Sequence, residues 1–384
     1  MPFANLNLWN ALAMIYQSIF SLITTFAVLC CSASGVFAQN SLLSPITHAV
    51  AGFLGTDGPG HSHHQQHHHR NRVDTHAPAG LMGDHVHAKG EKMVEYKFMN
   101  MSMHGIQQGR TSISPSEFLN SQGPMGFMMA PSTMNMEMHM VHFMWAPSDK
   151  TTLYVMPMLV DNTMKMKYLS NSKIRTINSR NRGFGDLPFG ALIKIKETKC
   201  DEWIVNIGWS APTGDIDNQK PTLESGMSAD FPYAMRLGKG SWAARPGLTY
   251  KRYHDKGVFG VQFQSDIVLG SNSEGYSASD DYRLNAWATR CLDADKTLAA
   301  SFRVEADWRS KIRGKDADLM MMMSPATRPD FYGGESINFG YGVMKTIQGG
   351  SRLNVEFYHP VYQDLDGTQM SSEWNLAASW SKSF

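Results

Sequence analysis

The feature that most constrains this 384-residue chain is a strict two-residue alternation of apolar and polar side chains from about residue 90 onward. Between residues 298 and 309, for example, Phe302 and Val304 fall on one face, whereas Arg303 and Glu305 fall on the other. This period is typical of strands whose two faces meet different surroundings. About twelve segments show it: 90–103, 134–146, 151–164, 185–198, 201–211, 242–253, 256–269, 281–291, 296–309, 335–347, 351–360 and 372–384.

The links between these segments alternate in length, which separates a membrane barrel from a soluble sandwich. The short links are 147–150, 199–200, 254–255, 293–295 and 348–350. The long links are 104–133, 165–184, 212–241, 270–280, 310–334 and 361–371. Short turns at one end and long loops at the other are typical of outer-membrane barrels, whose strands must close on themselves in lipid. The sequence therefore predicts an all-β protein, a transmembrane antiparallel β-barrel of about twelve strands over residues 90–384.

Aromatic residues near the strand ends are expected to contact the lipid bilayer at its interfaces, as in barrel girdles. They are Trp145, Trp203, Trp209, Trp242, Tyr250, Tyr282, Trp308, Tyr341, Trp374 and Trp380. The last strand ends in Phe384, a feature that we associate with recognition by the outer-membrane assembly machinery.

The balance of 35 Lys and Arg against 34 Asp and Glu gives no electrostatic footprint for nucleic acid. No catalytic motif stands in a credible context, so we do not expect an enzyme.

The N-terminal residues divide into two parts. Residues 1–38 are predicted to be a signal peptide, because an apolar run ends in Val36-Phe37-Ala38 with small residues at the cleavage positions. No Lys or Arg precedes that run, so the usual basic start is missing. Residues 39–89 are rich in Gly, His, Pro and Ala, and such a segment is not expected to bury a core. We expect a disordered periplasmic tail there, beside a barrel in the outer membrane.

Candidate metal ligands gather in that tail and in the first strands. The histidines are His61, His63, His64, His67, His68, His69, His85 and His87. Imidazole suits copper(II) and zinc ions, although a tag-like or pH-responsive solubilising tail has the same composition. Seventeen of the 27 Met lie between residues 82 and 166. Of these, Met99, Met101 and Met103 share a face with charged residues, which predicts a lumenal ladder of soft thioether ligands.

The neighbouring methionines allow the opposite assignment. Met134, Met136, Met138 and Met140 alternate with Asn135, Glu137 and His139. We expect these four to contact lipid, because the intervening residues are polar.

The predicted lumen carries charges of both signs. The residues expected to line it are Arg245, Asp266, Arg283, Arg303, Glu305, Asp307, Arg309, Arg352 and Glu356. Mixed signs favour an interior whose charges pair with one another over a filter for one ion charge.

Three motifs carry a family resemblance. The stretches Gly183–Asp186, Ser210–Asp215 and Pro360–Gly367 resemble the recurring turns of proteobacterial outer-membrane "transporter" proteins, which are grouped with the barrels of the phenol meta-cleavage pathway. The stretch Met82–His87 is similar to the start of the barrel in a Met-rich branch. The resemblance covers residues 82–384 and implies an outer-membrane barrel that passes small molecules, without indicating which.

We therefore expect a passive channel for small solutes, with soft, copper-type metal ions as the leading candidate and no required cofactor. One alternative is a channel for aromatic or hydrophobic compounds, which an apolar lumen would support. Another is a metal-sequestering anchor without transport, which a lumen blocked by Arg303, Glu305, Arg309 and Arg352 would support.

Overall fold

The computed structural model describes residues 72–120, 126–170, 173–221 and 228–384, and most of these residues lie in antiparallel strands. Within them, no helix is both long and apolar enough to cross a membrane. Eleven strands form one closed ring: β1 (Lys92–Gly109), β3 (Met129–Ser148), β4 (Thr151–Val155), β7 (Leu187–Glu197), β8 (Asp201–Ala211), β11 (Ala243–His254), β12 (Gly257–Val268), β14 (Asp281–Cys291), β15 (Leu298–Arg309), β17 (Gly334–Thr346) and β18 (Arg352–Ser383).

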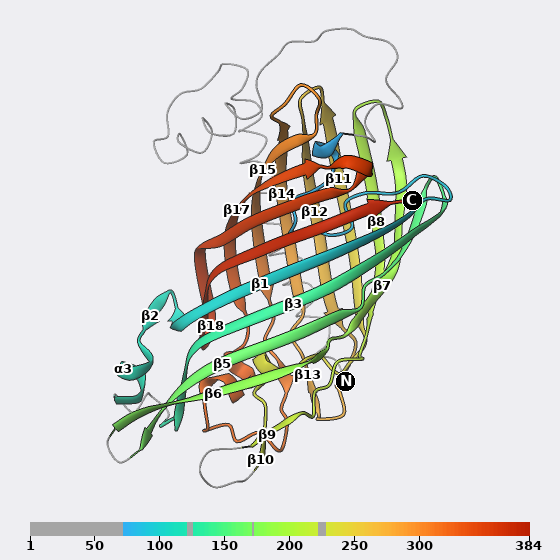
Figure 1. Ribbon diagram of the computed structural model, residues 1–384. Coiled ribbons are helices and arrows are strands. Elements are labelled where there is room, and N and C mark those ends of the chain that lie inside the picture. Colours follow the sequence, from blue (N-terminus) through green and yellow to red (C-terminus); the bar gives the residue numbers. More distant parts are fainter. Residues whose placement is uncertain (1–71, 121–125, 171–172, 222–227) are drawn as a thin grey trace, which may run out of the picture. The chain divides into compact units, whose positions relative to one another are not determined.

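The ring closes because β1 pairs with β18 on one side and with β3 on the other. Closure leaves no open edge in the ring, as lipid requires. The strands slant across the barrel, as closed sheets must (Figure 1). The predicted all-β antiparallel barrel is confirmed.

The last strand supplies two crossings. The rings of Phe357 and Trp374 stack with their centroids 6.2 Å apart. On a straight strand, 17 residues would separate them by about 55 Å. The chain of β18 therefore reverses between them, and Gly367 at the reversal has φ of 73°. Counted in this way, the barrel has twelve crossings, the predicted number.

The predicted short links are tight turns at one end of the barrel, but two of the predicted long loops are wrong. Residues 165–184 form most of a hairpin of β5 (Met158–Ser170) and β6 (Lys173–Phe184), which continues β4 and β7 beyond the ring. The predicted loop 361–371 is likewise mostly strand, within β18. The outer face of the β5–β6 hairpin is mostly polar, although Leu169 and Ile174 are exposed on it. Asp161 and Arg180 form an ion pair there, for example.

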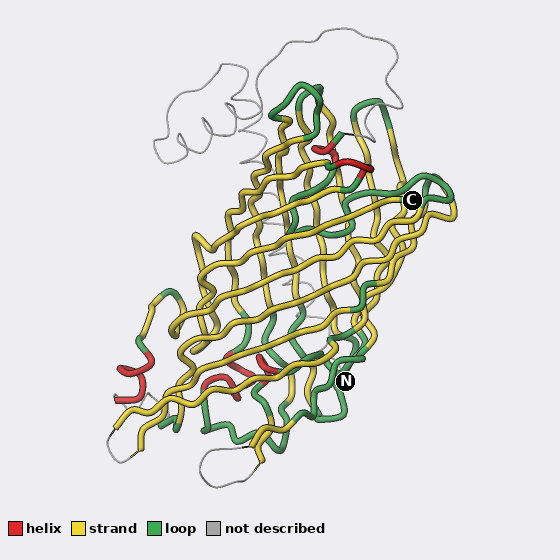
Figure 2. The backbone as a smooth tube through the Cα atoms, in the orientation of Figure 1, coloured by secondary structure: helices red, strands yellow, loops and turns green. Residues whose placement is uncertain are grey.

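The remaining elements lie in the long loops, except η5, which forms the short turn between β17 and β18 (Figure 2). They are β2 (Thr111–Ile113), α3 (Pro115–Asn120), β9 (Gln219–Pro221), β10 (Ser228–Asp230), η2 (Tyr233–Met235), β13 (Tyr276–Ser277), β16 (Arg313–Gly314), η3 (Pro325–Thr327), η4 (Pro329–Phe331) and η5 (Gln348–Gly350).

The outer surface of the ring carries an apolar band. Large apolar side chains are exposed on eight of the eleven ring strands, among them Phe143, Trp145, Leu153, Val155, Ile195, Ile207, Trp209, Leu248, Ile337, Tyr341, Val343, Leu353, Val355, Phe357 and Trp380. Exposed apolar residues in such numbers are typical of a surface that faces lipid.

Residues 72–89, which we call the plug, lie inside the barrel. Val73 of the short η1 (Val73–Thr75) packs on Ala299 and Met344, and Leu81 packs on Trp287. The prediction of a disordered tail over 39–89 is therefore wrong for residues 72–89. The physical reason is that the plug buries its few apolar side chains against the inner wall rather than against one another. Residues 1–38 and 39–71, with the predicted signal peptide, lie outside the described residues.

Candidate functional site

The plug is held by hydrogen bonds from the inner wall to its backbone. Lys97 Nζ donates to Leu81 O at 2.8 Å, and Gln262 Nε2 donates to Met82 O at 3.0 Å. Further donors to plug carbonyl groups come from β12, β14 and β18, namely Gln264, Thr289 and Asn354. Because a buried carbonyl group without a partner is costly, these contacts allow irregular backbone to occupy the lumen.

The tip of the plug lies on a buried ion network. Arg303 lies between Glu305 and Glu356, with N–O distances of 2.6 and 2.7 Å. The backbone N–H of Gly80 donates to Glu356 Oε2 at 2.6 Å. A Cβ atom at Gly80 would lie 2.7 Å from Arg303 Nη2 and 2.8 Å from Glu356 Oε2, so only glycine fits there without a shift.

The other predicted lumenal charges also lie on the inner face. Arg245 contacts Asp266 at 3.5 Å, and Arg283 contacts Asp307 at 3.3 Å. Arg309 binds Asp281 instead of joining the network of Arg303 and Glu305. Arg352 contacts the plug directly, at Nε2 of His76. The mixed charges thus pair with one another and with the plug.

Space beside the plug is small. A cavity of about 20 Å³, lined by Met82, Tyr154, Arg245 and Gln264 among others, lies between the plug and β4, β8, β11 and β12. This volume holds about one water molecule. Tyr154 lies against Gly190 and Gly208, where a Cβ atom would come within 3.0 and 2.5 Å of its hydroxyl oxygen.

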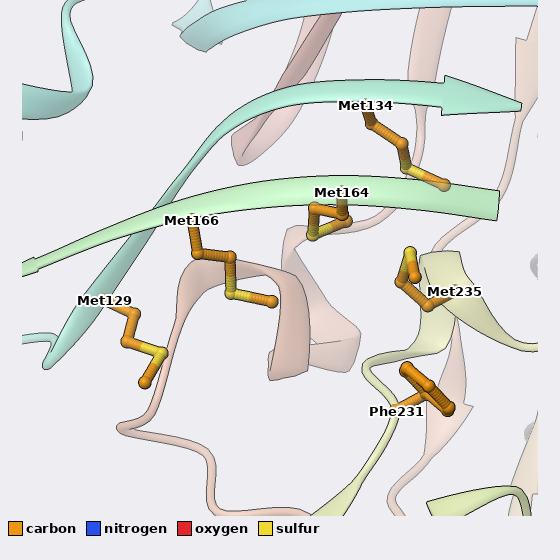
Figure 3. Close-up of a cluster of buried hydrophobic side chains, with 6 residues drawn as sticks. All are labelled: Met129, Met134, Met164, Met166, Phe231 and Met235. Atoms are coloured by element: carbon orange, nitrogen blue, oxygen red, sulfur yellow. The ribbon is translucent and has the colours of Figure 1, made fainter. Parts of the chain in front are cut away.

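The long-loop half of the barrel interior holds a cluster of methionine side chains. Five methionines and Phe231 are buried there, with four further methionines partly buried against them. This methionine cluster consists of Met129, Met134, Met164, Met166, Met235, Met103, Met136, Met323 and Met370. Figure 3 shows Met129, Met134, Met164 and Met166 spread along β3 and β5, with Phe231 and Met235 of the segment around η2 packed against them.

The placement of the β3 methionines corrects the sequence prediction. Met134 and Met140 are buried inside the barrel, and Met136 packs in the methionine cluster, so these side chains do not contact lipid. The polar residues between these methionines face outward. His139 Nδ1, for example, is 2.7 Å from the hydroxyl oxygen of the exposed Tyr96. The reason is that this part of β3 extends past the apolar band, where the outer face meets water.

The predicted ladder connects the two halves of the lumen. Met99 packs against Ala79 of the plug, with Tyr358 and Ala377. Met103 belongs to the methionine cluster, and Met101 lies between them on β1, opposite Met136 of β3. The three thioethers therefore extend from the plug tip toward the long-loop end, and Met99 and Met103 pack in different clusters.

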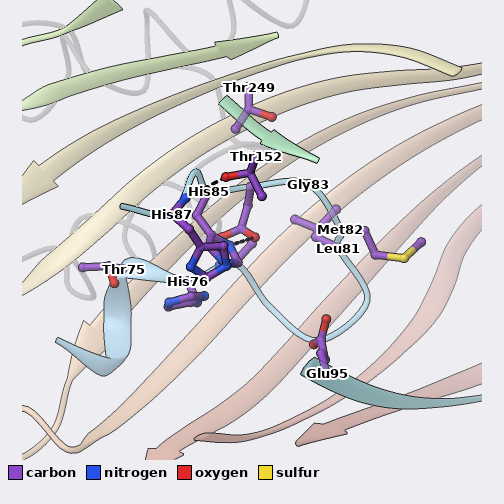
Figure 4. A network of polar contacts seen from close by, with 12 residues as sticks. Thr75, His76, Leu81, Met82, Gly83, His85, His87, Glu95, Thr152 and Thr249 are labelled. Atoms are coloured by element: carbon purple, nitrogen blue, oxygen red, sulfur yellow. Dashed lines mark hydrogen bonds and ion pairs between the residues drawn. The ribbon is translucent and has the colours of Figure 1, made fainter. Parts of the chain in front are cut away.

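Of the predicted histidine ligands, His61, His63, His64, His67, His68 and His69 lie outside the described residues. His85 and His87 lie in the plug together with His76 and Asp84 (Figure 4). Nitrogen or oxygen atoms of His76, Asp84 and His85 lie within 4.8 Å of one another. Sequence reasoning did not assign His76 to this group, because it is separated from the other histidines along the chain and joins them only through the fold of the plug.

Burial sets the protonation of two of these rings. Burial is the main reason why the pKa of His87 falls to about 4. Burial, and then the charge of Arg352, hold the pKa of His76 well below its usual value. Both rings are therefore neutral at pH 7, and the neutral imidazole is the form that can accept a hydrogen bond or bind a metal.

A closed antiparallel barrel with an apolar outer band and an internal plug is an outer-membrane barrel in fold. The chain is similar to an outer-membrane channel from Pseudomonas putida F1, with 14% identity, a TM-score of 0.52, and coverage of 78% of this chain and 97% of that one. It is also similar to the toluene transporter TodX of P. putida, with 10% identity, a TM-score of 0.40, and coverage of 78% and 91%. No family model matches the chain, and no curated protein matches it in sequence. At these identities, the likeness to the F1 channel establishes the fold alone.

Proposed function

We propose that this chain is an outer-membrane channel for small apolar solutes, aromatic compounds among them. The observation that carries the proposal is the methionine cluster, which lines the long-loop half of the lumen with apolar side chains. Water-filled membrane barrels have polar interiors, whereas sites for small apolar molecules are lined mainly by apolar groups. Methionine side chains are flexible and polarizable, so they adapt to ligands of different shape.

The arrangement supports an apolar solute over a soft metal ion. A metal ion requires several sulfur atoms around one point, whereas Met99 and Met103 pack in separate clusters. A row of thioethers between the long loops and the plug instead offers continuous apolar contact to a solute that moves along it. The outer-membrane channel from P. putida F1 shares the fold, which is consistent with this proposal.

The plug has its own part in the proposed function. It occupies the short-turn half of the lumen, where the neighbouring cavity holds about one water molecule. We therefore propose that the solute binds in the methionine cluster first and that the plug must shift before the solute leaves.

We also propose that the short-turn end and the N-terminal tail lie in the periplasm. Protease accessibility of an epitope in residues 39–71, in intact and in permeabilised cells, tests this orientation.

The test of the solute uses intact cells, because toluene crosses a phospholipid bilayer unaided and the lipopolysaccharide leaflet is the barrier that a channel must overcome. Uptake of labelled toluene at low concentration is measured in cells that make the parent, a Met103→Gln/Met134→Gln/Met164→Gln variant, or the matched Met→Leu variant. Gln keeps the side-chain length but adds a polar amide, whereas Leu keeps the apolar character and removes sulfur. We expect uptake to fall several-fold with Gln and to stay near the parent level with Leu.

Copper(I) uptake in the same cells separates the alternatives. If both triple variants abolish copper uptake and toluene uptake is the same in all three strains, the solute is a soft cation and our proposal is wrong. Equal amounts of folded protein in the outer membrane, measured by heat-modifiable migration in gels, are the control for assembly.

A further inference from the structure

Two histidines of the plug are oriented by carboxylates in the same way. His85 Nδ1 lies 2.8 Å from Asp84 Oδ1, and His87 Nδ1 lies 3.1 Å from Glu91 Oε1. In each ring Nδ1–H donates a hydrogen bond to the carboxylate, which leaves the lone pair on Nε2. A carboxylate or carbonyl partner on the second ring nitrogen is the usual arrangement of a metal-binding histidine, because it fixes the tautomer and the ring orientation.

The opposite nitrogen of each ring lacks a partner. Nε2 of His85 and Nε2 of His87 are both buried, and neither has a hydrogen-bond partner among the described residues. A buried polar atom without a partner costs about 1–3 kcal/mol. Two such atoms on neighbouring rings therefore offer lone pairs that a bound species would satisfy.

The rings are close enough to share one ion. The ring centroids of His85 and His87 are 4.8 Å apart, and those of His76 and His85 are 4.2 Å apart. Ligand atoms of His76 and His85 lie within 4.8 Å of each other, whereas His87 adjoins His85 by its ring alone. Zinc–imidazole bonds are about 2.0–2.1 Å long, so side-chain rotations, that of His87 included, are needed to bring the three rings onto one ion. Figure 4 shows the three rings gathered at the same part of the plug.

We infer that the plug holds a divalent cation of the zinc class, bound by Nε2 of His85, Nε2 of His87 and the ring of His76. Imidazole ligands with carboxylates behind them suit zinc(II), nickel(II) and copper(II), whereas the soft thioethers of the methionine cluster are not part of this site. The inference concerns the plug alone and does not depend on which solute the channel carries.

Arg352 of β18 opposes this site. Its guanidinium contacts Nε2 of His76, which engages that nitrogen and places a positive charge beside the proposed cation. Cation binding must therefore move Arg352 away from His76, and removal of its charge must strengthen binding. This gives the inference a test in which a substitution raises the affinity, a result that loss of folding does not produce.

The experiment uses full-length protein in which His61, His63, His64, His67, His68 and His69 are each replaced by Ser, so that the tract cannot bind metal. Zinc(II) is titrated into this parent in detergent by calorimetry, and copper(II) is added in parallel to count nitrogen ligands by electron paramagnetic resonance. We expect one ion per chain. His85→Gln and His87→Gln should each lower zinc affinity at least tenfold, Asp84→Asn should lower it 10–100-fold as orienting partners do, and Arg352→Gln should raise it.

The matched control is His359→Gln, at a half-buried histidine outside the plug whose Nδ1 lies 2.9 Å from the Tyr341 hydroxyl oxygen, and it should leave the affinity unchanged. The inference is wrong if the parent binds no stoichiometric zinc(II), or if His85→Gln and His87→Gln bind it as tightly as the parent. Because toluene uptake is not measured here, failure of the zinc site and failure of the proposed channel are distinguishable.

Discussion

At the scale of single residues, close contact between the plug and the wall depends on the absence of a side chain at Gly80. Its backbone N–H binds Glu356, and the Arg303 guanidinium lies across the place where a Cβ atom would be. The charges of Arg303 and Glu356 are buried, and Glu305 is half-buried beside them, so the network does not move aside at low cost. The plug tip is thus positioned by one backbone amide on one ion network.

Substitution at Gly80 should therefore loosen the plug. We expect Gly80→Val to increase ion conductance across planar bilayers, and Gly80→Ala to do so to a smaller extent, because the larger side chain displaces the plug further. Lys89→Val, at the exposed end of the plug, is the control and should leave the conductance at the parent level. A Gly80→Val channel that conducts like the parent would show that the plug tip does not restrict the lumen.

At the scale of elements, the plug and the ring are stabilised by different interactions. The ring closes through backbone ladders between β1, β3 and β18, and none of these hydrogen bonds involves the plug. The plug is bound by side chains of several strands and by small apolar clusters around Val73, Ala79 and Leu81. It can therefore leave the lumen without opening the barrel.

Deletion of residues 72–89 tests this independence. We expect the shortened protein to assemble into a barrel that shifts on heating in gels, because its ladders are intact. Its ion conductance should exceed that of Gly80→Val, since water then surrounds the charges that the plug contacted. A deletion variant that fails to fold would mean that the plug is part of the stabilising core of the barrel.

At the scale of the whole molecule, the placement of charged and apolar residues is the reverse of that in a soluble protein. Charged residues such as Arg303 and Lys251 are fully buried in the lumen, whereas large apolar residues are exposed around the ring. The arrangement is stable only where lipid covers the apolar band. A charge placed in the middle of that band must therefore destabilise the protein, and a charge at the turns must not.

Leu248→Arg and Leu292→Arg are a matched pair for this test. Leu248 lies in the middle of β11 and is 40% exposed, whereas Leu292 lies in a short turn and is 57% exposed. Arginine on the lipid face costs about 2–4 kcal/mol near the bilayer midplane and about 0–1 kcal/mol near its interfaces. We expect these losses in the free energy of unfolding, measured by denaturant titration in lipid vesicles. Equal losses at both positions would contradict the assignment of the apolar band.

Some features of this structure can be predicted from residues that are neighbours in the sequence. The alternation in residues 298–309 correctly indicates a strand with Arg303 and Glu305 on one face, because the period of two is a property of extended backbone itself. The alternation of link lengths likewise indicated the turns at one end and the closed barrel. These features depend only on residues that are neighbours in the chain.

The sequence alone thus determined most of the strands, which residues share a face of each, and the number of crossings, but it took residues 165–184 and 361–371 for loops. Only the tertiary structure decided that Met134 and Met136 face the lumen, because Met and Asn alternate equally well in either direction and the packing on Met235 selects one. It also placed the plug, whose Gly80 contacts Glu356 at a separation of 276 positions. Contacts between segments so far apart leave no period in the sequence, since each depends on the closed ring that brings them together.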